Sequence, residues 1–161
     1  MARYLFVTTW QLETTIESVW QTINEPEKWP EWWPAVKSVT NLAQGDDQGI
    51  GRKWRFVYVS KLPYKLAFES EIVRKEPPFI LEGKAYGELE GSGRWELSQE
   101  NSVTAVRYIW DVATTKGWMN LLAPLLRPLF SWNHNITMQA CSEGMARYLG
   151  ARLVRSASDD S

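Results

Sequence analysis

Hydrophobic and polar residues alternate along most of the first two thirds of the chain, a pattern typical of β-strands that bury one face. Residues 3–13 are rich in aromatic and β-branched side chains and predict a first strand. Residues 14–24 carry apolar side chains at helical spacing, which predicts a short helix. Pro26, Pro30 and Pro34 then prevent a long helix, so we expect the tryptophans between them on a short helical turn and loops.

Strict alternation returns in the middle of the chain. Trp54, Phe56 and Tyr58 share one face of a strand, and Phe68 and Ser70 share one face of the next. The glycine-rich segment after them predicts two strongly bent strands, and one more alternating segment closes the series. Together these segments predict an antiparallel meander with one apolar face and one wet face.

From Gly117 onward the period becomes helical, which predicts a long C-terminal helix. Pro124 and Pro128 interrupt its beginning, so we expect a helix in two pieces. One wide sector of this helix is apolar and holds Phe130, His134, Thr137, Met138, Cys141, Met145, Tyr148 and Leu149. The opposite side carries Asn135, Gln139, Ser142 and Glu143. A curved sheet with a wet outer face and a helix with a wide apolar face predict an α+β fold in which the sheet wraps around the helix.

The chain length of 161 residues suits one domain, which we place at residues 1–154. The last seven residues, "RSASDDS", are small and polar. We therefore expect residues 155–161 to form a short frayed tail.

Composition and charge narrow the possible partners and the compartment. The net charge of −1 provides no electrostatic footprint for a phosphate backbone, so we expect no nucleic-acid partner. Cys141 is the only cysteine, which excludes an internal disulfide and a thiolate zinc site and favours a reducing compartment. The N-terminus does not have the pattern of a signal peptide, and no apolar run is long enough to span a membrane, so we place the protein in the cytoplasm. The ten tryptophans are unusual, and so many large rigid rings suit a protein that lines or covers a cavity.

Three segments carry a resemblance to a known family: "EPEKWPEWWPAVKSV", "GELEGSGRWEL" and "WDVATTKGWMNLLAPLLRPLFSWNHN". With these three segments in this order, the chain resembles the polyketide cyclase/dehydrase branch of the START-like superfamily, also called SRPBCC. The resemblance implies a helix-grip fold, with two short helices after the first strand and a curved antiparallel sheet around a long C-terminal helix. It also implies a cavity between sheet and helix for a hydrophobic, often ring-containing ligand. It carries over no universal catalytic motif and implies no cofactor.

In such a fold the turn after the first helix lies near one end of the cavity. Trp29, Trp32 and Trp33 would then cap the cavity mouth while the prolines hold the turn rigid. The alternative is that these tryptophans only anchor the turn on the edge of the sheet.

The candidate ligand-binding residues are those expected to face the cavity from the strands and the long helix: Trp54, Phe56, Tyr58, Phe68, Ser70, Trp95, Tyr108, Trp110, Asn133, His134, Met138 and Cys141. Tyr58 and Ser70 offer hydroxyls on otherwise apolar faces. His134 is the only histidine, and it is either a polar anchor or proton carrier facing a ligand or a structural histidine bonded to a strand or loop. No metal site is expected, because the helix face around His134 lacks carboxylates at ligand spacing.

Three functions remain open from the residues. The first is binding or transport of a small hydrophobic, lipid-like or aromatic ligand, which needs no catalyst. The second is a cyclase, dehydratase or hydrolase, for which His134 is the only good acid or base. The third is a protein-interaction role for the tryptophan-rich turn and the leucine-rich residues 117–130. Residues 117–130 are a lid, a surface for docking or transient membrane contact, or only the start of the helix. The identity of the ligand and the oligomeric state also stay open.

Overall fold

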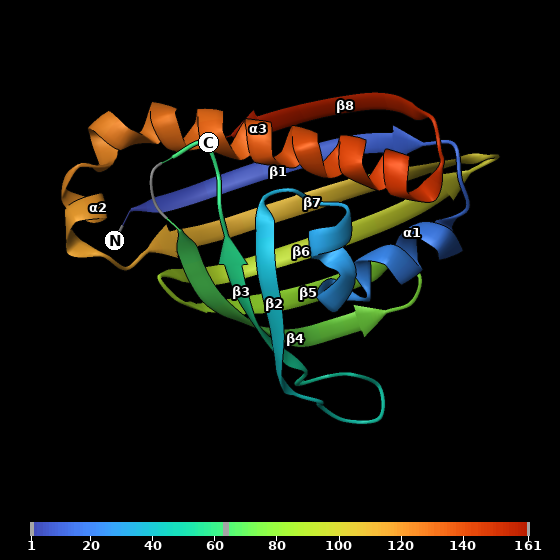
Figure 1. Ribbon diagram of the computed structural model, residues 1–161, viewed down its shortest axis with the longest axis horizontal. Coiled ribbons are helices and arrows are strands. Elements are labelled where there is room, and N and C mark those ends of the chain that lie inside the picture. The colour runs from blue at the N-terminus through green and yellow to red at the C-terminus, as the bar shows by residue number, and fades with distance from the viewer. Residues whose placement is uncertain (1, 63–64, 161) are drawn as a thin grey trace.

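The computed structural model describes residues 2–62 and 65–160 as an antiparallel sheet with a long helix lying across it (Figure 1). The sheet has eight strands in the order β2-β3-β4-β5-β6-β7-β1-β8. Their bounds are Arg3–Leu12 (β1), Val36–Ala43 (β2), Lys53–Tyr58 (β3), Leu66–Glu76 (β4), Ile80–Gly87 (β5), Leu89–Glu100 (β6), Val103–Thr114 (β7) and Leu153–Asp160 (β8). The predicted meander is present, because each strand from β2 to β7 pairs with the next one along the chain.

The helices occupy the connections before and after this meander. After β1 come the α-helix α1 (Ile16–Ile23) and the 3-10 helix η1 (Pro26–Glu31), as the sequence predicts. After β7 come α2 (Gly117–Leu121) and α3 (Ala123–Leu149), so the C-terminal helical tract is divided in two as predicted. Pro128, however, lies inside α3 and does not interrupt it. The break lies at Leu122, two residues before Pro124, where a proline at the start of the new helix costs no hydrogen bond. These elements make up the α+β helix-grip fold.

The apolar core lies between the sheet and α3 and is unusually aromatic. Trp10 and Trp95 meet edge to face with their ring centroids 6.0 Å apart, and both are almost fully buried. Helix α3 and the end of η1 approach closely at Gly144, where an added Cβ atom would lie only 1.9 Å from the backbone oxygen of Trp32. A glycine is therefore required for the turn after η1 to reach the helix.

The expectation that residues 155–161 would be frayed is wrong for the part that the structure describes. Gly150 ends α3 in the left-handed conformation, with a φ of 62°, and the chain returns as β8. Strand β8 pairs antiparallel with the outer edge of β1, from Leu12 opposite Leu153 to Phe6 opposite Asp160. The physical reason is that the edge of β1 presents backbone donors and acceptors, which even small polar residues can satisfy.

Strand β8 also changes the environment of one side of α3. Ser142, which the helical pattern places on the polar side, is fully buried and donates a hydrogen bond to the backbone oxygen of Gln139 at 2.9 Å. Its hydroxyl oxygen lies 3.5 Å from that of Ser156 in β8. The prediction that Ser142 faces solvent is wrong because the pattern of α3 alone does not reveal that a strand packs beside it.

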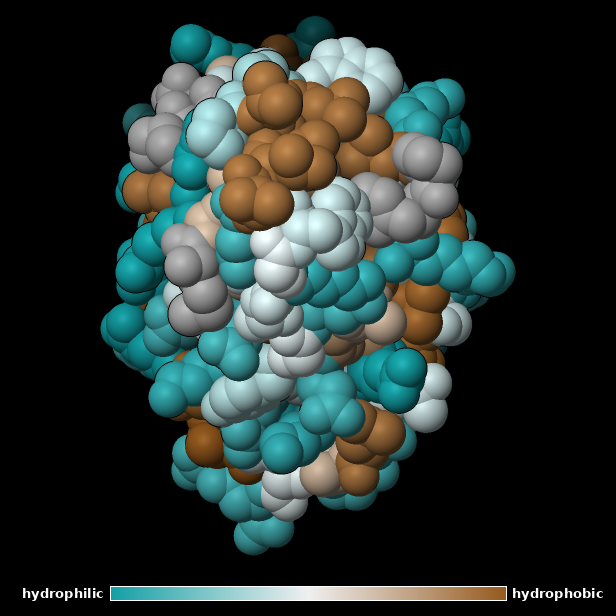
Figure 2. All heavy atoms as spheres, turned by 90° about the vertical axis from the view of Figure 1, so that its left-hand side faces the viewer, coloured by the Kyte–Doolittle hydropathy of each residue, from teal (hydrophilic) through white to brown (hydrophobic). Residues whose placement is uncertain are grey.

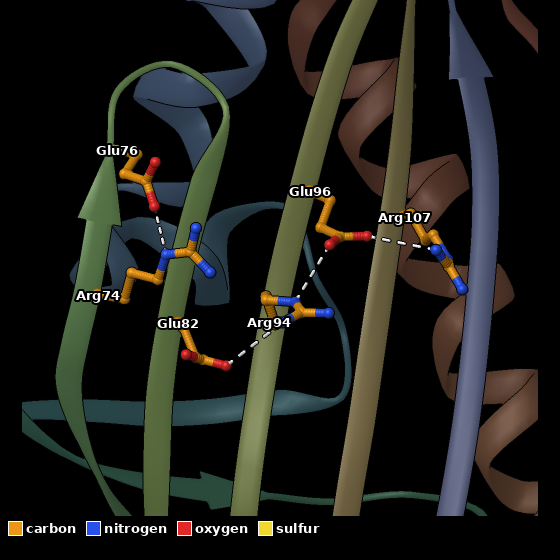
Figure 3. Close-up of polar contacts among 6 residues, drawn as sticks. All are labelled: Arg74, Glu76, Glu82, Arg94, Glu96 and Arg107. Carbon is orange, nitrogen blue, oxygen red and sulfur yellow. Dashed lines mark hydrogen bonds and ion pairs between the residues drawn. The ribbon is translucent and has the colours of Figure 1, made fainter.

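The outer face of the sheet carries a row of ion pairs that crosses β4 to β7 (Figure 3). The pairs are Arg74 with Glu76, Arg94 with Glu82 at 3.8 Å, Arg94 with Glu96 at 3.2 Å, and Arg107 with Glu96 at 3.5 Å. Such exposed pairs contribute little individually to the free energy of unfolding. They identify the wet face of the sheet, which leaves the opposite, aromatic face toward α3. No helix in the described ranges has the length and apolar character needed to span a bilayer.

Candidate functional site

A cavity of about 130 Å³ lies between the aromatic face of the sheet and α3. The sheet contributes Tyr4, Phe6, Tyr58, Leu66, Phe68, Leu89, Tyr108, Trp110, Val112 and Thr114. The helices contribute Met119, Phe130, Asn133, His134, Thr137 and Met138, and the connecting segments contribute Trp33, Ala35, Val59 and Ser60. Close-packed interiors contain few voids larger than a water molecule, so a cavity of this size is a candidate binding site.

A second chamber of about 40 Å³ lies behind the first and includes Ser70 and Trp95 in its wall. Four aromatic residues border both spaces: Tyr58, Phe68, Tyr108 and Trp110. Gly93 allows this aromatic partition to lie close to β6, because an added Cβ there would be 2.9 Å from the Tyr108 hydroxyl and 3.0 Å from ring atoms of Trp110. The partition therefore separates a larger space from a smaller one.

Three phenols give the main cavity a polar component. Burial raises the pKa of Tyr58 and Tyr108, so both hydroxyls stay neutral and can donate hydrogen bonds. The Tyr4 hydroxyl is buried without a hydrogen-bond partner among the residues that the structure describes, and the Arg127 guanidinium lies 4.6 Å from the centre of the Tyr4 ring. These groups can bind a hydroxyl or carbonyl oxygen on an otherwise apolar ligand.

His134 and Asn133 enter the same cavity from α3. The imidazole of His134 stacks on Phe6, with the ring centroids 4.1 Å apart and the planes 16° from parallel. The side-chain oxygen of Asn133 is buried without a hydrogen-bond partner in the described part of the chain. Phe6 therefore fixes the ring plane of the only histidine at the cavity wall.

The structure divides the residues predicted for the site into three groups. The main cavity brings together Tyr58, Phe68, Tyr108, Trp110, Asn133, His134, Met138 and Trp33. The second chamber holds Trp54, Phe56, Ser70, Trp95 and Trp29 beside the shared partition. Cys141 and Trp32 border neither space. Cys141 is fully buried on α3, and burial raises the pKa of its thiol.

The tryptophans after α1 combine anchoring with lining. The Trp29 indole donates to the backbone oxygen of Thr22 at 3.2 Å, and the Trp33 indole donates to the backbone oxygen of Thr137 at 3.1 Å. Trp32 stacks on Trp33 at 5.9 Å and turns its other side toward a surface groove. All three rings thus hold the turn in place, and Trp33 alone among them also lines the main cavity.

Several cavity residues were not predicted from the sequence, among them Tyr4 and Phe6 in β1. Both lie at the inward positions of this alternating strand. Their pairing positions, Tyr4 opposite Val112 and Phe6 opposite Trp110, place them next to the predicted strand β7. Alternation within residues 3–13 was the available signal, but only the pairing of β1 with β7 brings these rings to the cavity.

Solved structures with the same fold share little sequence identity with this chain. The Zhui aromatase/cyclase of Streptomyces sp. R1128 has a TM-score of 0.77 at 12% identity over 92% of this chain and 94% of its own. A START superfamily protein of Mycobacterium smegmatis has a TM-score of 0.74 at 12% identity over 91% of this chain and 97% of its own. A protein of Thermus thermophilus has a TM-score of 0.71 at 17% identity over 89% of this chain and 98% of its own. At these identities the likeness establishes the fold.

The family follows from a match of the sequence itself. No curated protein matches the chain significantly. Residues 12–139, however, match the family described as polyketide cyclase / dehydrase and lipid transport, which covers the first strand's end, the meander and the first half of α3. Because this match spans most of the sequence, the chain belongs to the polyketide cyclase/dehydrase and lipid transport family.

Proposed function

We propose that this protein binds a small hydrophobic molecule with an aromatic or other flat ring and at least one hydroxyl or carbonyl oxygen. The observation that carries the proposal is the aromatic cavity between the sheet and α3, with the neutral hydroxyls of Tyr58 and Tyr108 in its wall. Stacked and edge-on rings would contact the ligand ring, and the phenols would orient its oxygen. The family description supports a cyclic or lipid-like ligand.

The size of the cavity bounds the part of the ligand that it encloses. Its volume of about 130 Å³ is similar to that of an engineered apolar cavity of about 150 Å³ that binds benzene. One ring therefore fits within the cavity as it stands. A second fused ring would extend toward the end bounded by α2 and the start of α3, where Met119 and Phe130 form the wall.

Native mass spectrometry of freshly purified protein tests this proposal for a ligand of any identity. We expect a mass increment that corresponds to one small molecule per chain and that disappears after extraction with an organic solvent. Protein that carries no such increment and also takes up no aromatic alcohol on addition would contradict the proposal.

A second candidate function, cyclisation or dehydration of the bound molecule, is supported by the position of His134. Its imidazole lies at the wall of the cavity that also contains the phenols, so a bound ligand would meet a group able to carry a proton near neutral pH. This function and pure binding differ in what the histidine must do.

The variant His134→Gln distinguishes the two candidates, because a glutamine amide can replace a hydrogen bond but cannot transfer a proton. For a binding protein we expect His134→Gln to remain folded and to change the affinity for 2-naphthol by less than about threefold. A turnover of the retained ligand that depends on pH, and that is lost in His134→Gln while ligand affinity survives, would instead make the protein an enzyme. Thermal unfolding of the variant serves as the control for folding.

A further inference from the structure

An exposed apolar stripe runs along α2 and the first half of α3 (Figure 2). It consists of Trp118, Leu121, Leu122, Leu125, Leu129 and Trp132, and this set is called the apolar stripe below. Leu121 is 81% exposed and Leu125 is 78% exposed, and the two tryptophans are each 50% exposed. Figure 2, which views the end of the molecule with α2, shows a large brown patch in its upper part and smaller brown areas elsewhere.

The spacing of the stripe shows that it is one face of a helix. Trp118, Leu122, Leu125, Leu129 and Trp132 follow one another at steps of three or four residues, and Leu121 lies next to Leu122 at the break between α2 and α3. Other residues of the same two helices, Met119 and Phe130, face the cavity. This segment is therefore apolar on two sides, one toward the cavity and one toward solvent.

The charges beside the stripe are unbalanced. The sequence contains no acidic residue between Asp111 and Glu143, a stretch that includes Lys116 and Arg127. The segment after β3, which borders the same end of the cavity through Val59 and Ser60, adds the exposed Lys61 and Lys65. These four basic side chains, called the basic rim below, belong to the helices of the stripe or to a segment that borders the same cavity, although the whole chain has a net charge of −1.

Carboxylates do not neutralise this rim completely. Glu88 pairs with Lys116 at 2.7 Å, and Asp111 pairs with Arg3 at 2.9 Å. No ion pair is found for Lys61 or Lys65 within the described residues. Lys65 lies close enough to Lys37 to lower the pKa of the Lys37 ammonium, so positive charges gather here.

From the stripe and its basic rim we infer that this end of the molecule docks on an anionic lipid bilayer. Leucines that protrude between two tryptophans suit insertion at the boundary between headgroups and acyl chains. Lysines beside them suit attraction to acidic headgroups. The same helices form the wall of the cavity, so docking brings the cavity next to a reservoir of apolar molecules.

Flotation with lipid vesicles tests this inference with the intact protein and no added ligand. We expect the protein to float with vesicles of phosphatidylcholine mixed with phosphatidylglycerol, more weakly with phosphatidylcholine alone, and less in high salt. The double variant Leu121→Asp/Leu125→Asp should lower vesicle affinity at least about tenfold. The matched control is Leu42→Asp, which changes a 46% exposed leucine of β2 and should bind as the wild type does.

The basic rim has its own pair of variants. Lys61→Gln/Lys65→Gln should reduce binding to the anionic vesicles severalfold and leave binding to phosphatidylcholine unchanged. Lys84→Gln, an exposed lysine of β5, should change neither. Because all of these side chains are exposed, thermal unfolding should show that the variants stay folded.

Two results would overturn the inference. The first is that the wild-type protein binds neither kind of vesicle, or that the Leu121→Asp/Leu125→Asp variant binds vesicles as tightly as the wild type. The second is a wild-type dimer, seen by sedimentation, that this double variant converts to a monomer while vesicles remain unbound, since the stripe would then be a contact between copies. Neither result bears on ligand binding in the cavity, which is measured without lipid.

Discussion

At the level of single residues, we expect the hydroxyls of Tyr58 and Tyr108 to determine which ligands the cavity prefers. Both phenols belong to the partition between the two spaces, and burial keeps both protonated by raising their pKa. A neutral phenol in an apolar wall contributes most to affinity when it forms a hydrogen bond with a ligand oxygen, because a buried hydroxyl without a partner is unfavourable. We therefore expect selectivity for oxygenated rings over plain hydrocarbons.

The variant Tyr108→Phe removes one of these hydroxyls and keeps the ring. Loss of one hydrogen bond should weaken the binding of 2-naphthol about fivefold, or about 1 kcal/mol, and leave the affinity for naphthalene unchanged. Isothermal titration calorimetry with both compounds measures the difference. Tyr86→Phe, at a 40% exposed tyrosine, is the matched control and should bind both as the wild type does. An equal loss of affinity for both compounds in Tyr108→Phe would show that the ring packing, and not the hydroxyl, was changed.

Alternation along the sequence was sufficient to identify the phenols of β3 and β7 but not every wall of the site. Tyr58 and Tyr108 stand at inward positions of their strands, and the structure finds both at the cavity. Ser70 also points inward, yet it lies in the second chamber. A pattern within one strand gives the face of a residue but not its position along the cavity, which depends on strand order and register.

At the scale of elements, the contact between α3 and the end of η1 holds the tryptophan-rich turn against the core. Gly144 permits this contact, since the Trp32 backbone oxygen occupies the space of a Cβ atom. The Trp33 indole then reaches the backbone of α3 at Thr137. One glycine and one hydrogen bond therefore fix the ring that lines the cavity from this side.

We predict that Gly144→Ala lowers the free energy of unfolding by at least about 2 kcal/mol, because backbone on both sides must move apart. Gly117→Ala is the matched control, because an added Cβ at Gly117 meets nothing within 4 Å, and its effect should be within about 0.5 kcal/mol. Urea unfolding followed by tryptophan fluorescence measures both. A Gly144→Ala protein as stable as Gly117→Ala would show that η1 does not depend on this close approach.

Elements with strong local signals were predictable, and β8 was not. The prolines and the change of period were enough to predict the short helices and the division between α2 and α3. The segment from Arg155 has no apolar face, so its strand structure depends on backbone pairing with β1, which no local pattern encodes. The burial of Ser142 depends on the same pairing.

At the scale of the whole molecule, the buried phenols make folding sensitive to alkaline pH. The folded-state pKa values of Tyr58 and Tyr108 are raised above the value of about 10 for an unfolded chain. Their contribution to stability is fully present below that pH. Above it the unfolded chain releases protons that the folded chain retains, so the free energy of unfolding falls as the pH rises.

We predict a fall of about 1.4 kcal/mol per pH unit for each of these two phenols once the pH exceeds about 10. Urea unfolding at several pH values between neutral and strongly alkaline solution measures the slope. The double variant Tyr58→Phe/Tyr108→Phe should have a shallower slope, whereas Tyr86→Phe should keep that of the wild type. Identical slopes in all three proteins would contradict the burial of these phenols.

The most direct test of the account is whether filling the cavity abolishes ligand binding. Thr137 lines the cavity from α3, and no hydrogen bond of its side chain is found within the described residues. The Trp33 indole bonds to its backbone oxygen, which a substitution of the side chain retains. Gln139, two residues later and exposed, provides a matched position for the same substitution. By calorimetry with 2-naphthol we expect about one site per wild-type chain, at least about tenfold weaker binding in Thr137→Phe, and unchanged binding in Gln139→Phe. A wild-type protein that binds no 2-naphthol, or a folded Thr137→Phe protein that binds it as tightly as Gln139→Phe, would contradict the claim that this cavity is the functional site.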